Sequence, residues 1–409
     1  MKILHINYTD TLGHRFNGGS LIPWLRERGN DALHLVGIKQ AIGDTSVNIV
    51  PDPSHPLGKR LTQWVGRIES AISIHNIFYP QSFLLPFNSA FKAADLVHYH
   101  IIHNNFFSYL AFPWLTKLKP AVWSLHDPWA FTGHCVHPFD CQGWKTGCHP
   151  CPHLNYPFAI SKDRAWLNYK LKNFAYQHSQ LHLIVASRWM QNLVEQSPLL
   201  GRFPVHYVPF GLDLNIFSPG NKAEAKAKFG ISDDQIVIGL RTLPGPYKGL
   251  EYSIKALELL HSEKPVHVLT CQTKGLLSSL ANKFPVTELG EINGDVAMAD
   301  FFRAIDIHLM PSMAESFGMM AMEAAACGVP SVVFYGTPLP EICFAPEGGI
   351  AVDRGNSHQL SQALHSLIHN ESMRLAMGQK ARYQAEKNYD FNVYAHSILR
   401  VYEQILTHS

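Results

Sequence analysis

Short apolar runs alternate with longer amphipathic segments along the whole chain, which is 409 residues long. An unbroken apolar run is typical of a strand buried on both faces, and an apolar period near 3.6 residues is typical of a helix. The expected strands are residues 3–8, 32–36, 96–100, 121–125, 183–186, 236–240, 266–270, 307–310 and 331–334, and the expected helices are residues 20–28, 166–177, 250–260, 297–304, 319–327 and 391–406. This alternation predicts an α/β fold with parallel sheets covered by helices on both faces.

The chain is long enough for two hydrophobic cores, because a domain usually holds about 100–200 residues. Residues 205–219 separate the two sets of expected strands, and Pro209, Gly211 and Pro219 within them predict a crossing between domains. The predicted parts are an N-terminal domain at residues 1–205, a second domain at residues 206–388 and a C-terminal segment at residues 389–409.

Composition and charge exclude several classes of protein. The chain is 46% hydrophobic and 16% charged, with a formal net charge of +2, which does not suggest a nucleic-acid-binding protein. No apolar run approaches the ~18 residues of a membrane span, and the first run is too short for a signal peptide. We therefore expect a cytoplasmic protein whose seven cysteines do not form a disulfide framework.

The segment 311–330 is the most informative stretch of the chain. Glu315 and Glu323 are separated by seven residues, with a Ser-Phe-Gly turn between them and a helix predicted after it. A strand, a glycine turn and a helix start form an anion site, because free backbone N–H groups and the helix dipole point outward there. One carboxylate in the turn and a second within the helix can then reach hydroxyl groups on either side of a bound phosphate. The alternative is an ordinary structural helix.

With Pro-Ser before it and Cys-Gly-Val-Pro after it, this segment resembles the E-x7-E signature of retaining glycosyltransferases of family 4. The resemblance implies that Glu315, Ser316, Phe317 and Gly318 bind the sugar and phosphates of a nucleotide-sugar donor. It further implies that Glu323 binds the ribose of the nucleotide. The same resemblance implies the GT-B fold, in which two Rossmann-like domains face each other across a cleft and the C-terminal helix packs back on the N-terminal domain.

Two cations follow the first strand of the second half. Arg241 and Lys248 lie in a loop rich in proline and glycine, and Lys248 immediately precedes a predicted helix. A nucleotide-sugar donor leaves as a diphosphate, and two fixed cations can neutralise the departing charge without a metal. The segment resembles the Arg…Lys-Gly diphosphate clamp of family 4. The alternative is a surface loop with ordinary solvated cations.

Two features of the first half lie at the ends of predicted strands. Gly18 and Gly19 follow the first strand and open a helix, so the backbone can approach a donor phosphate or sugar closely there, although a glycine pair is often just a turn. His126 ends a later strand, where ligands of open parallel sheets bind, although a single histidine is often structural. The resemblance places His126 beside the transferred sugar and completes a catalytic set of His126, Glu315, Arg241 and Lys248, with Asp127 orienting the histidine or touching the acceptor.

The region 134–153 holds a cluster of cysteines that resembles an insertion found in polysaccharide-building members of the family. The cysteines are Cys135, Cys141, Cys148 and Cys151, with histidines between them. These ligand types suit a structural zinc ion, and the alternatives are buried thiols, a disulfide pair or an iron–sulfur site. We expect the insertion to shape the acceptor side and to take no direct part in catalysis.

An amphipathic stretch is predicted at residues 57–72. Its apolar residues share one helical face, with Lys59, Arg60 and Arg67 elsewhere on the helix. Such a helix can rest on an anionic membrane, where lipid-linked acceptors are found, although an apolar stripe more often faces a core. The apolar set is Leu57, Leu61, Trp64, Val65, Ile68 and Ile72.

The whole pattern predicts a retaining glycosyltransferase of hexosyl type that needs no cofactor for catalysis. It would move a sugar from a nucleoside-diphosphate donor to a hydroxyl group of a glycan or lipid-linked acceptor, in surface polysaccharide or lipid-linked glycan synthesis, at the inner face of the membrane. The mechanism implied is front-face transfer, in which the leaving diphosphate accepts the proton of the acceptor. The alternatives are another GT-B activity, such as an epimerase or a phosphorylase, and a catalytically degenerate sugar-binding or assembly subunit.

Overall fold

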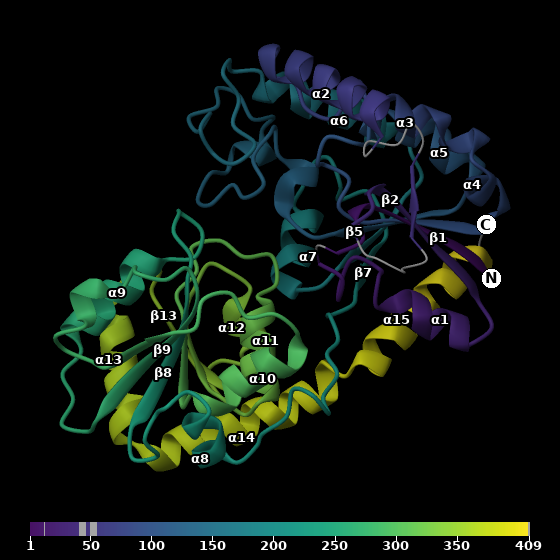
Figure 1. Ribbon diagram of the computed structural model, residues 1–409. Coiled ribbons are helices and arrows are strands. Elements are labelled where there is room, and N and C mark those ends of the chain that lie inside the picture. The colour runs from purple at the N-terminus through teal and green to yellow at the C-terminus, as the bar shows by residue number, and fades with distance from the viewer. Residues whose placement is uncertain (12, 41–45, 50–54, 408–409) are drawn as a thin grey trace. The chain divides into compact units, whose positions relative to one another are not determined.

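The structure is a computed structural model that describes residues 1–11, 13–40, 46–49 and 55–407. It divides into two compact units (Figure 1). Unit 1 contains Met1–Phe210 together with Ala395–Ser409, and unit 2 contains Gly211–Tyr394. The long helix α15, Phe391–Thr407, begins in unit 2 and supplies its remaining turns to unit 1.

Unit 1 is built on a seven-stranded sheet in which every strand pairing is parallel. The strand order is β3-β2-β1-β4-β5-β6-β7, so the chain reverses its direction of winding between β1 and β4. The strands are β1 (Lys2–Thr9), β2 (Asp31–Ile38), β3 (Val47–Asn48), β4 (Leu96–Tyr99), β5 (Ala121–Leu125), β6 (His182–Val185) and β7 (Val205–Tyr207). The α-helices are α1 (Leu21–Glu27), α2 (Pro56–Ala71), α3 (Pro80–Leu84), α4 (Ser89–Ala93), α5 (Phe112–Leu118), α6 (Ala165–Gln177), α7 (Arg188–Glu195) and most of α15.

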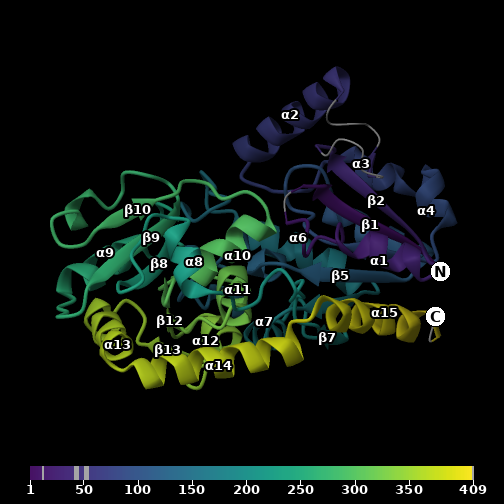
Figure 2. The same cartoon turned by 60° about the horizontal axis from the view of Figure 1, so that its bottom comes forward.

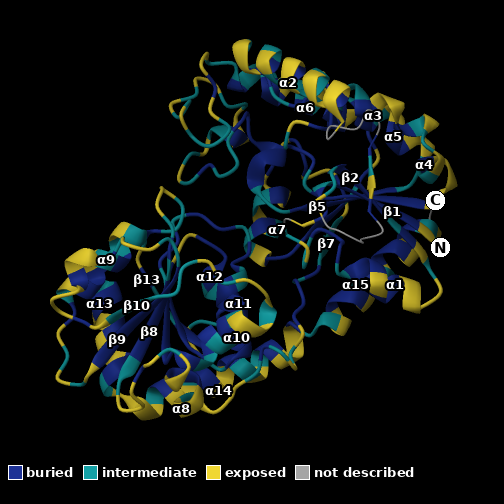
Figure 3. Ribbon diagram, in the orientation of Figure 1, coloured by how far each residue is buried: buried dark blue, intermediate teal, exposed yellow. Residues whose placement is uncertain are grey.

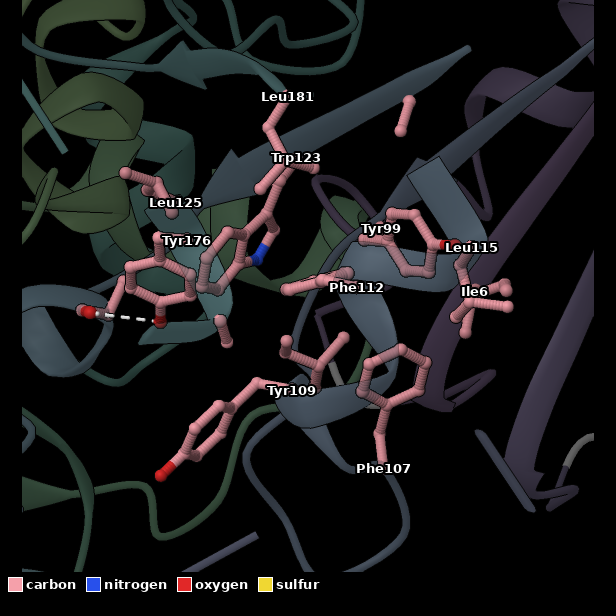
Figure 4. Packing of buried hydrophobic residues seen from close by; sticks show 14 of the residues in the cluster. Ile6, Tyr99, Phe107, Tyr109, Phe112, Leu115, Trp123, Leu125, Tyr176 and Leu181 are labelled. Atoms are coloured by element: carbon pink, nitrogen blue, oxygen red, sulfur yellow. Dashed lines mark hydrogen bonds between the residues drawn. The ribbon is translucent and has the colours of Figure 1, made fainter. Parts of the chain in front are cut away.

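The two faces of this sheet differ in chemistry. On one face Ile6, Tyr99 and Trp123 point into an aromatic core completed by residues of α5 and α6, such as Phe112 and Tyr176 (Figure 4). Alternate residues of the same strands point the other way, because successive side chains of a strand face opposite sides. Those positions are covered by α1 and α15 and hold histidines, described below (Figure 1).

Unit 2 contains a six-stranded sheet that is also entirely parallel, in the order β10-β9-β8-β11-β12-β13. Its strands are β8 (Ile236–Thr242), β9 (Val266–Gln272), β10 (Val286–Glu288), β11 (Ile307–Met310), β12 (Ser331–Phe334) and β13 (Gly349–Val352). Its α-helices are α8 (Lys222–Ala227), α9 (Leu250–Leu259), α10 (Asp295–Ala304), α11 (Met319–Ala326), α12 (Leu339–Ile342), α13 (Ser357–His369) and α14 (Glu371–Asn388). Helices α9 and α13 cover one face of the sheet, and α10 and α11 cover the other (Figure 2).

Both units are therefore Rossmann-like, with a buried parallel sheet between helices (Figure 3). In such folds ligands bind beyond the carboxyl ends of the strands, at the point where the winding reverses. That point lies between β1 and β4 in unit 1 and between β8 and β11 in unit 2. These two strand edges are where functional residues are expected.

The structure corrects two sequence-based expectations, one for residues 205–219 and one for the amphipathic stretch at residues 57–72. Residues 205–219 were expected to be a crossing only, but Val205–Tyr207 pair with β6 as the edge strand β7. The apolar stripe of α2 was treated as one face, but only Val65 is buried, whereas Leu57 and Trp64 are exposed. No helix among the described residues is both long and apolar enough to cross a membrane.

Candidate functional site

The loops that follow β8 and β11 in unit 2 are joined by backbone hydrogen bonds and by a close backbone contact. Tyr247 carbonyl oxygen accepts hydrogen bonds from the N–H groups of Met313 (2.7 Å) and Ala314 (3.2 Å). Gly249 has φ +63°, and a Cβ at this residue would lie 1.9 Å from the carbonyl oxygen of Pro311. Only glycine fits there, because both the backbone conformation and the close approach exclude a side chain. The two predicted donor-binding loops therefore form one surface.

Lys248 and Glu315 form an ion pair across these loops. Glu315 is 9% exposed, and its Oε1 also accepts a hydrogen bond from Ser312 Oγ at 3.2 Å. A partly buried pair of this kind is held in one geometry and interacts more strongly than a solvated pair. The structure thus brings together two of the predicted catalytic residues that are 67 positions apart in sequence.

Arg241 lies near the end of β8, the strand that pairs with β11. Its Nη2 donates a hydrogen bond to Gln272 Oε1 at 2.9 Å, and Gln272 ends the neighbouring strand β9. The Nε of Arg241 is buried and has no hydrogen-bond partner among the described residues. A buried donor without a partner is costly, so this guanidinium retains capacity to bind an acceptor such as a phosphate oxygen.

The turn between Glu315 and α11 has the geometry expected of a strand–turn–helix anion site. Gly318 has φ +106°, and a Cβ there would lie 2.3 Å from Leu339 Cδ2. Ser316 and Phe317 precede it, and α11 begins at Met319. Glu323 lies within α11 and is 4% exposed. The predicted donor-binding residues of unit 2 therefore follow β8 and β11 at the reversal point of the sheet.

In unit 1 the predicted glycine loop and the predicted histidine lie on either side of His100. A Cβ at Gly18, which has φ +92°, would lie 2.9 Å from His100 Nε2 and 2.5 Å from His5 Nδ1. The other ring nitrogen of His100, Nδ1, lies 3.4 Å from His126 Nε2. The side chain of buried Asn17 accepts the N–H of Gly19 at 2.9 Å and so fixes the loop. The sequence prediction omitted His5 and His100, which join the two features.

His126 is enclosed by aromatic rings and remains neutral. The rings of Phe16 and Phe210 lie 5.1 Å and 5.9 Å from the His126 ring, centre to centre. Burial lowers the pKa of His126 to about 4, although the neighbouring Asp127 opposes this shift. The ring of Phe210 stacks on the histidine, with 19° between the ring planes.

Asp127 is held by two hydrogen-bonding partners and does not act as a free carboxylate. Its Oδ2 lies 3.0 Å from His103 Nε2, and its Oδ1 accepts the N–H of Trp129 at 2.9 Å. Burial favours the neutral acid, but His103 outweighs it, so the pKa of Asp127 lies below its usual value. Asp127 thus bonds to His103 and to the Trp129 N–H, and its expected role of orienting His126 or touching the acceptor stays a prediction.

A layer of buried histidines lies under α1 and α15. His5 on β1 is paired in register with His34 on β2 and with His98 on β4. His98 uses both ring nitrogens, one with Tyr402 OH at 2.6 Å and one with Ser124 Oγ at 2.8 Å. Ligand atoms of His5, His98 and His100 lie within 4.8 Å of one another. Because these rings are already hydrogen-bonded to protein groups, we interpret them as a neutral polar network.

This network predicts acid sensitivity. Burial lowers the pKa of His5 to about 3 and holds those of His98 and His100 well below 6.5. Between about pH 6.5 and pH 4 the unfolded chain binds protons that the folded chain does not, so stability falls as pH falls. Each such histidine contributes up to about 1.4 kcal/mol per pH unit. Denaturant midpoints measured from pH 7.5 to pH 5 should show this loss.

A matched pair of variants tests the assignment. His5→Gln should flatten the dependence of the midpoint on pH, whereas His178→Gln, at an exposed histidine of unit 1, should leave it unchanged. Equal slopes for wild type and His5→Gln would show that the histidine layer is not the origin of the acid sensitivity.

The four cysteines of the insertion converge in unit 1. They line a small cavity between the loop after β5 and the start of α6. All four are free thiols. Burial raises the pKa of Cys135 and Cys148 to about 12. Isolated thiols with this pKa are poor nucleophiles at neutral pH, which argues against a catalytic role for these cysteines.

Comparison with known proteins identifies the second unit. The family described as "Glycosyl transferases group 1" matches residues 221–384. The chain therefore contains a group 1 glycosyltransferase domain. This domain holds Arg241, Lys248, Glu315 and Glu323, and the predicted resemblance to glycosyltransferase family 4 is confirmed.

Named relatives match part of the chain. A D-inositol 3-phosphate glycosyltransferase of Thermobifida fusca is 29% identical over 41% of this chain and 42% of its own length. A protein of the same name from Mycobacteroides abscessus is 26% identical over 70% of this chain and 63% of its own length. The chain thus spans about two fifths to just under two thirds of the length of these relatives.

Solved structures match over the full length. Sucrose-phosphate synthase from Thermosynechococcus elongatus has a TM-score of 0.71 at 15% identity and covers 100% of both chains. Anabaena Alr3699/HepE in complex with UDP and glucose has a TM-score of 0.67 at 16% identity, covering 99% of this chain and 100% of its own. At these identities the likeness shows the fold alone. The predicted fold class, GT-B with two Rossmann-like domains, is confirmed.

Proposed function

We propose that this protein is a retaining glycosyltransferase that moves a hexosyl group from a nucleoside-diphosphate donor to a hydroxyl group of an acceptor. The observation that carries the proposal is the Lys248–Glu315 ion pair, which joins the loops that follow β8 and β11 at the reversal point of the sheet in the group 1 glycosyltransferase domain. Relatives named as glycosyltransferases and a neighbouring structure bound to UDP and glucose support it.

Each unit 2 side chain then has a distinct chemical role. Arg241 and Lys248 stabilise the negative charge that develops on the diphosphate as the sugar–oxygen bond breaks. Glu315 holds Lys248 in place and accepts hydrogen bonds from hydroxyl groups of the sugar. The N–H groups around Phe317 and Gly318 bind phosphate oxygens, because they precede a helix start. Glu323, buried in α11, binds the ribose hydroxyl groups.

In this mechanism the residues of unit 1 contact the transferred sugar and the donor. Neutral His126, held between aromatic rings, offers a ring nitrogen to hydroxyl groups of the transferred sugar, and Gly18 and Gly19 let the backbone approach the donor. Asp127 is occupied by His103 and Trp129, so we assign no nucleophile on this side. The leaving diphosphate accepts the proton of the acceptor, which gives front-face transfer with retention.

The direct test is release of nucleoside diphosphate from a panel of UDP-, GDP-, ADP- and CDP-sugars, with UDP-glucose first, because UDP and glucose occupy the Anabaena neighbour. A transferase releases the diphosphate in proportion to product, and NMR of the product reports retention at the anomeric carbon. A sugar-binding or assembly subunit raises its melting temperature with the matching nucleotide but releases nothing. That second outcome would replace the proposed activity by the binding function.

We also propose that α2 meets an anionic membrane, which would place the enzyme beside lipid-linked acceptors. Leu57 is 70% exposed and Trp64 is 62% exposed, and both lie on α2 with exposed Lys59, Arg60 and Arg67. Apolar side chains flanked by basic ones bind anionic lipid surfaces. A hydrogen bond of 3.4 Å from Gln81 to Thr62 joins α2 to α3.

The exposed apolar surface continues from α3 to α5. Phe83 and Leu84 of α3 are exposed, and the ring of Phe87, just after α3, lies 6.4 Å from that of Trp114 on α5. This continuity favours contact with an extended surface such as a bilayer.

Sedimentation with phosphatidylglycerol vesicles tests the membrane contact. The double variant Leu57→Ser/Trp64→Ser should bind about tenfold more weakly than wild type, because two large apolar side chains no longer enter the lipid. Tyr335→Ser, at an exposed aromatic residue of unit 2, is the control and should bind normally. Equal binding by the double variant and the control would remove α2 from the proposed contact.

A further inference from the structure

The cysteine insertion surrounds a space of the right size for one ion. Cys135, Cys141, Cys148 and Cys151 all line a cavity of about 20 Å³, together with His134 and Trp144. A space this small admits about one water molecule or one metal ion. Its thiols come from a segment of 17 residues that contains little regular secondary structure, so side-chain contacts must define its shape. Small segments with so little core are often held by a metal.

Backbone donors already point at two of the sulfur atoms. The N–H of Gly133 lies 3.2 Å from Cys148 Sγ, and the N–H of Gly143 lies 3.4 Å from Cys141 Sγ. The Gly143 contact comes from the residue two positions after the cysteine, and a side chain at Gly143 would itself meet that sulfur at 3.4 Å. Hydrogen bonds to sulfur stabilise thiolate charge, and such outer contacts orient metal ligands.

A buried lysine contacts the wall of the same cavity, because Lys172 Nζ donates to Thr132, which lines the cavity together with the four cysteines. Lys172 on α6 is 1% exposed, and its Nζ donates to the carbonyl oxygens of Trp129 (2.5 Å) and Thr132 (3.0 Å). It also lies 3.6 Å from the centre of the Trp129 ring. Among the described residues no carboxylate is within ion-pair distance of Lys172, and burial lowers the pKa of Lys172 to about 7.

The position of Lys172 needs a compensating negative charge. A lone ammonium group buried without a counter-charge is strongly destabilising, whereas thiolates at Cys135 and Cys148 would provide that charge. Neutral thiols would leave Lys172 with carbonyl and aromatic partners only. A metal ion deprotonates its cysteine ligands and so creates a negative cluster at this point.

We propose that Cys135, Cys141, Cys148 and Cys151 hold one zinc ion in a closed structural site, and that the ammonium group of Lys172 balances part of its charge. Four thiolates around one Zn²⁺ carry a net charge of −2, and binding releases one proton from each thiol. An all-sulfur set suits tetrahedral zinc and leaves no open position for catalysis. His134 Nδ1 donates to the carbonyl oxygen of Phe158 at 2.9 Å, and His134 Nε2 lies 3.5 Å from Cys151 Sγ.

Zinc binding would contract the insertion. No three of the thiols have sulfur atoms within 4.8 Å of one another in the part of the chain that the structure describes. A closed site requires shorter spacings, so the ion draws the four side chains inward over the cavity. Lys172 then connects the site to the turn at Trp129, whose N–H group binds Asp127. The ion thus supports the loop that carries His126 and Asp127.

The first experiment measures metal in full-length protein purified without an affinity tag. We expect about one zinc per chain, and a Co²⁺-substituted sample should show thiolate-to-cobalt charge-transfer bands. The paired variant Cys148→Ser/Cys151→Ser should lose the metal, whereas Cys327→Ser and Cys343→Ser, at buried cysteines of unit 2, should retain it. Absence of zinc, iron in its place, or zinc retained by the paired variant would overturn the proposal.

A second measurement does not depend on whether the cysteine variants fold. Titration of wild-type protein with a mercurial reagent should release one zinc as four thiols react, and protection of residues 134–153 from hydrogen exchange should fall at the same point. Release of zinc without thiol modification, or unchanged protection, would contradict a four-thiolate site.

A matched pair of variants tests the role of Lys172. Lys172→Met should weaken zinc binding about tenfold, measured by competition with a chelator, because outer partners of ligands typically alter affinity by 10–100-fold. Lys170→Met, at an exposed lysine of the same helix, should bind zinc as wild type does. Equal zinc affinity in both variants would separate Lys172 from the site.

Discussion

Lys248→Met is expected to lower turnover about a hundredfold while the protein stays folded. Lys248 stabilises the departing diphosphate in the proposed mechanism, and loss of one such group costs roughly 3 kcal/mol in the transition state. The ground-state affinity for the nucleotide should change less, because the charge grows as the bond breaks. Steady-state release of nucleoside diphosphate gives turnover, and calorimetry gives nucleotide affinity.

Lys255→Met is the matched control, because Lys255 on α9 is an exposed lysine paired with Glu258 and lies away from the loop. It should retain wild-type turnover. Arg241→Met should resemble Lys248→Met, since both cations act on the same leaving group. If Lys248→Met and Arg241→Met both turn over at the wild-type rate, the diphosphate assignment is wrong.

Gly249→Ala is expected to destabilise unit 2 by about 3 kcal/mol or more. The added Cβ would lie 1.9 Å from the Pro311 carbonyl oxygen, at a residue with φ +63°. A left-handed conformation costs an alanine roughly 1 kcal/mol or more, and the steric overlap adds a further 1–3 kcal/mol. In a domain of this size such a loss lowers the melting temperature by about 6–12 °C.

Gly245→Ala separates the cost of the backbone conformation from the cost of steric overlap. Gly245 also has a positive φ, +112°, but a Cβ there would meet nothing within 4 Å. This variant should lose only the conformational part, about 1 kcal/mol. Equal losses in melting temperature for the two variants would mean that contact with Pro311 is not what fixes Gly249.

The sequence predicted the central strands well because each is rich in apolar residues, although His5 and Asn7 of β1 and His98 of β4 interrupt the apolar runs. It missed short edge strands such as β7 and β13, since Val205–Tyr207 lie among prolines and Gly349–Val352 begin with glycine. Strands at a sheet edge need fewer apolar residues, so their composition resembles that of a loop. Their existence follows from pairing with a neighbour, which the local sequence does not contain.

Site residues were predictable where they belong to a local sequence motif. They were unpredictable where their contacts depend on which strands pair and in what register. The spacing of Glu315 and Glu323 is visible in the sequence, but the pairing of Glu315 with Lys248 depends on β8 lying beside β11. Contact of Arg241 with Gln272 likewise depends on the alignment of β8 and β9. His5 and His98 come together only through strand pairing, although alternating histidines at 98 and 100 were a usable signal.

The histidine layer has a consequence for hydrogen bonding at His126. His5 Nδ1 lies 3.0 Å from His100 Nε2, and His100 Nδ1 lies 3.4 Å from His126 Nε2, so each contact needs one donor and one acceptor. Because a neutral imidazole carries a single proton, fixing the tautomer of one ring fixes the other two. When His5 donates, His126 Nδ1 bears a proton; when His5 accepts, His126 Nδ1 is a bare lone pair. If one proton enters at His5 Nε2 while another leaves from His126 Nδ1, the three tautomers change together, and His126 Nδ1 changes from donor to acceptor without altering the net charge of the three rings.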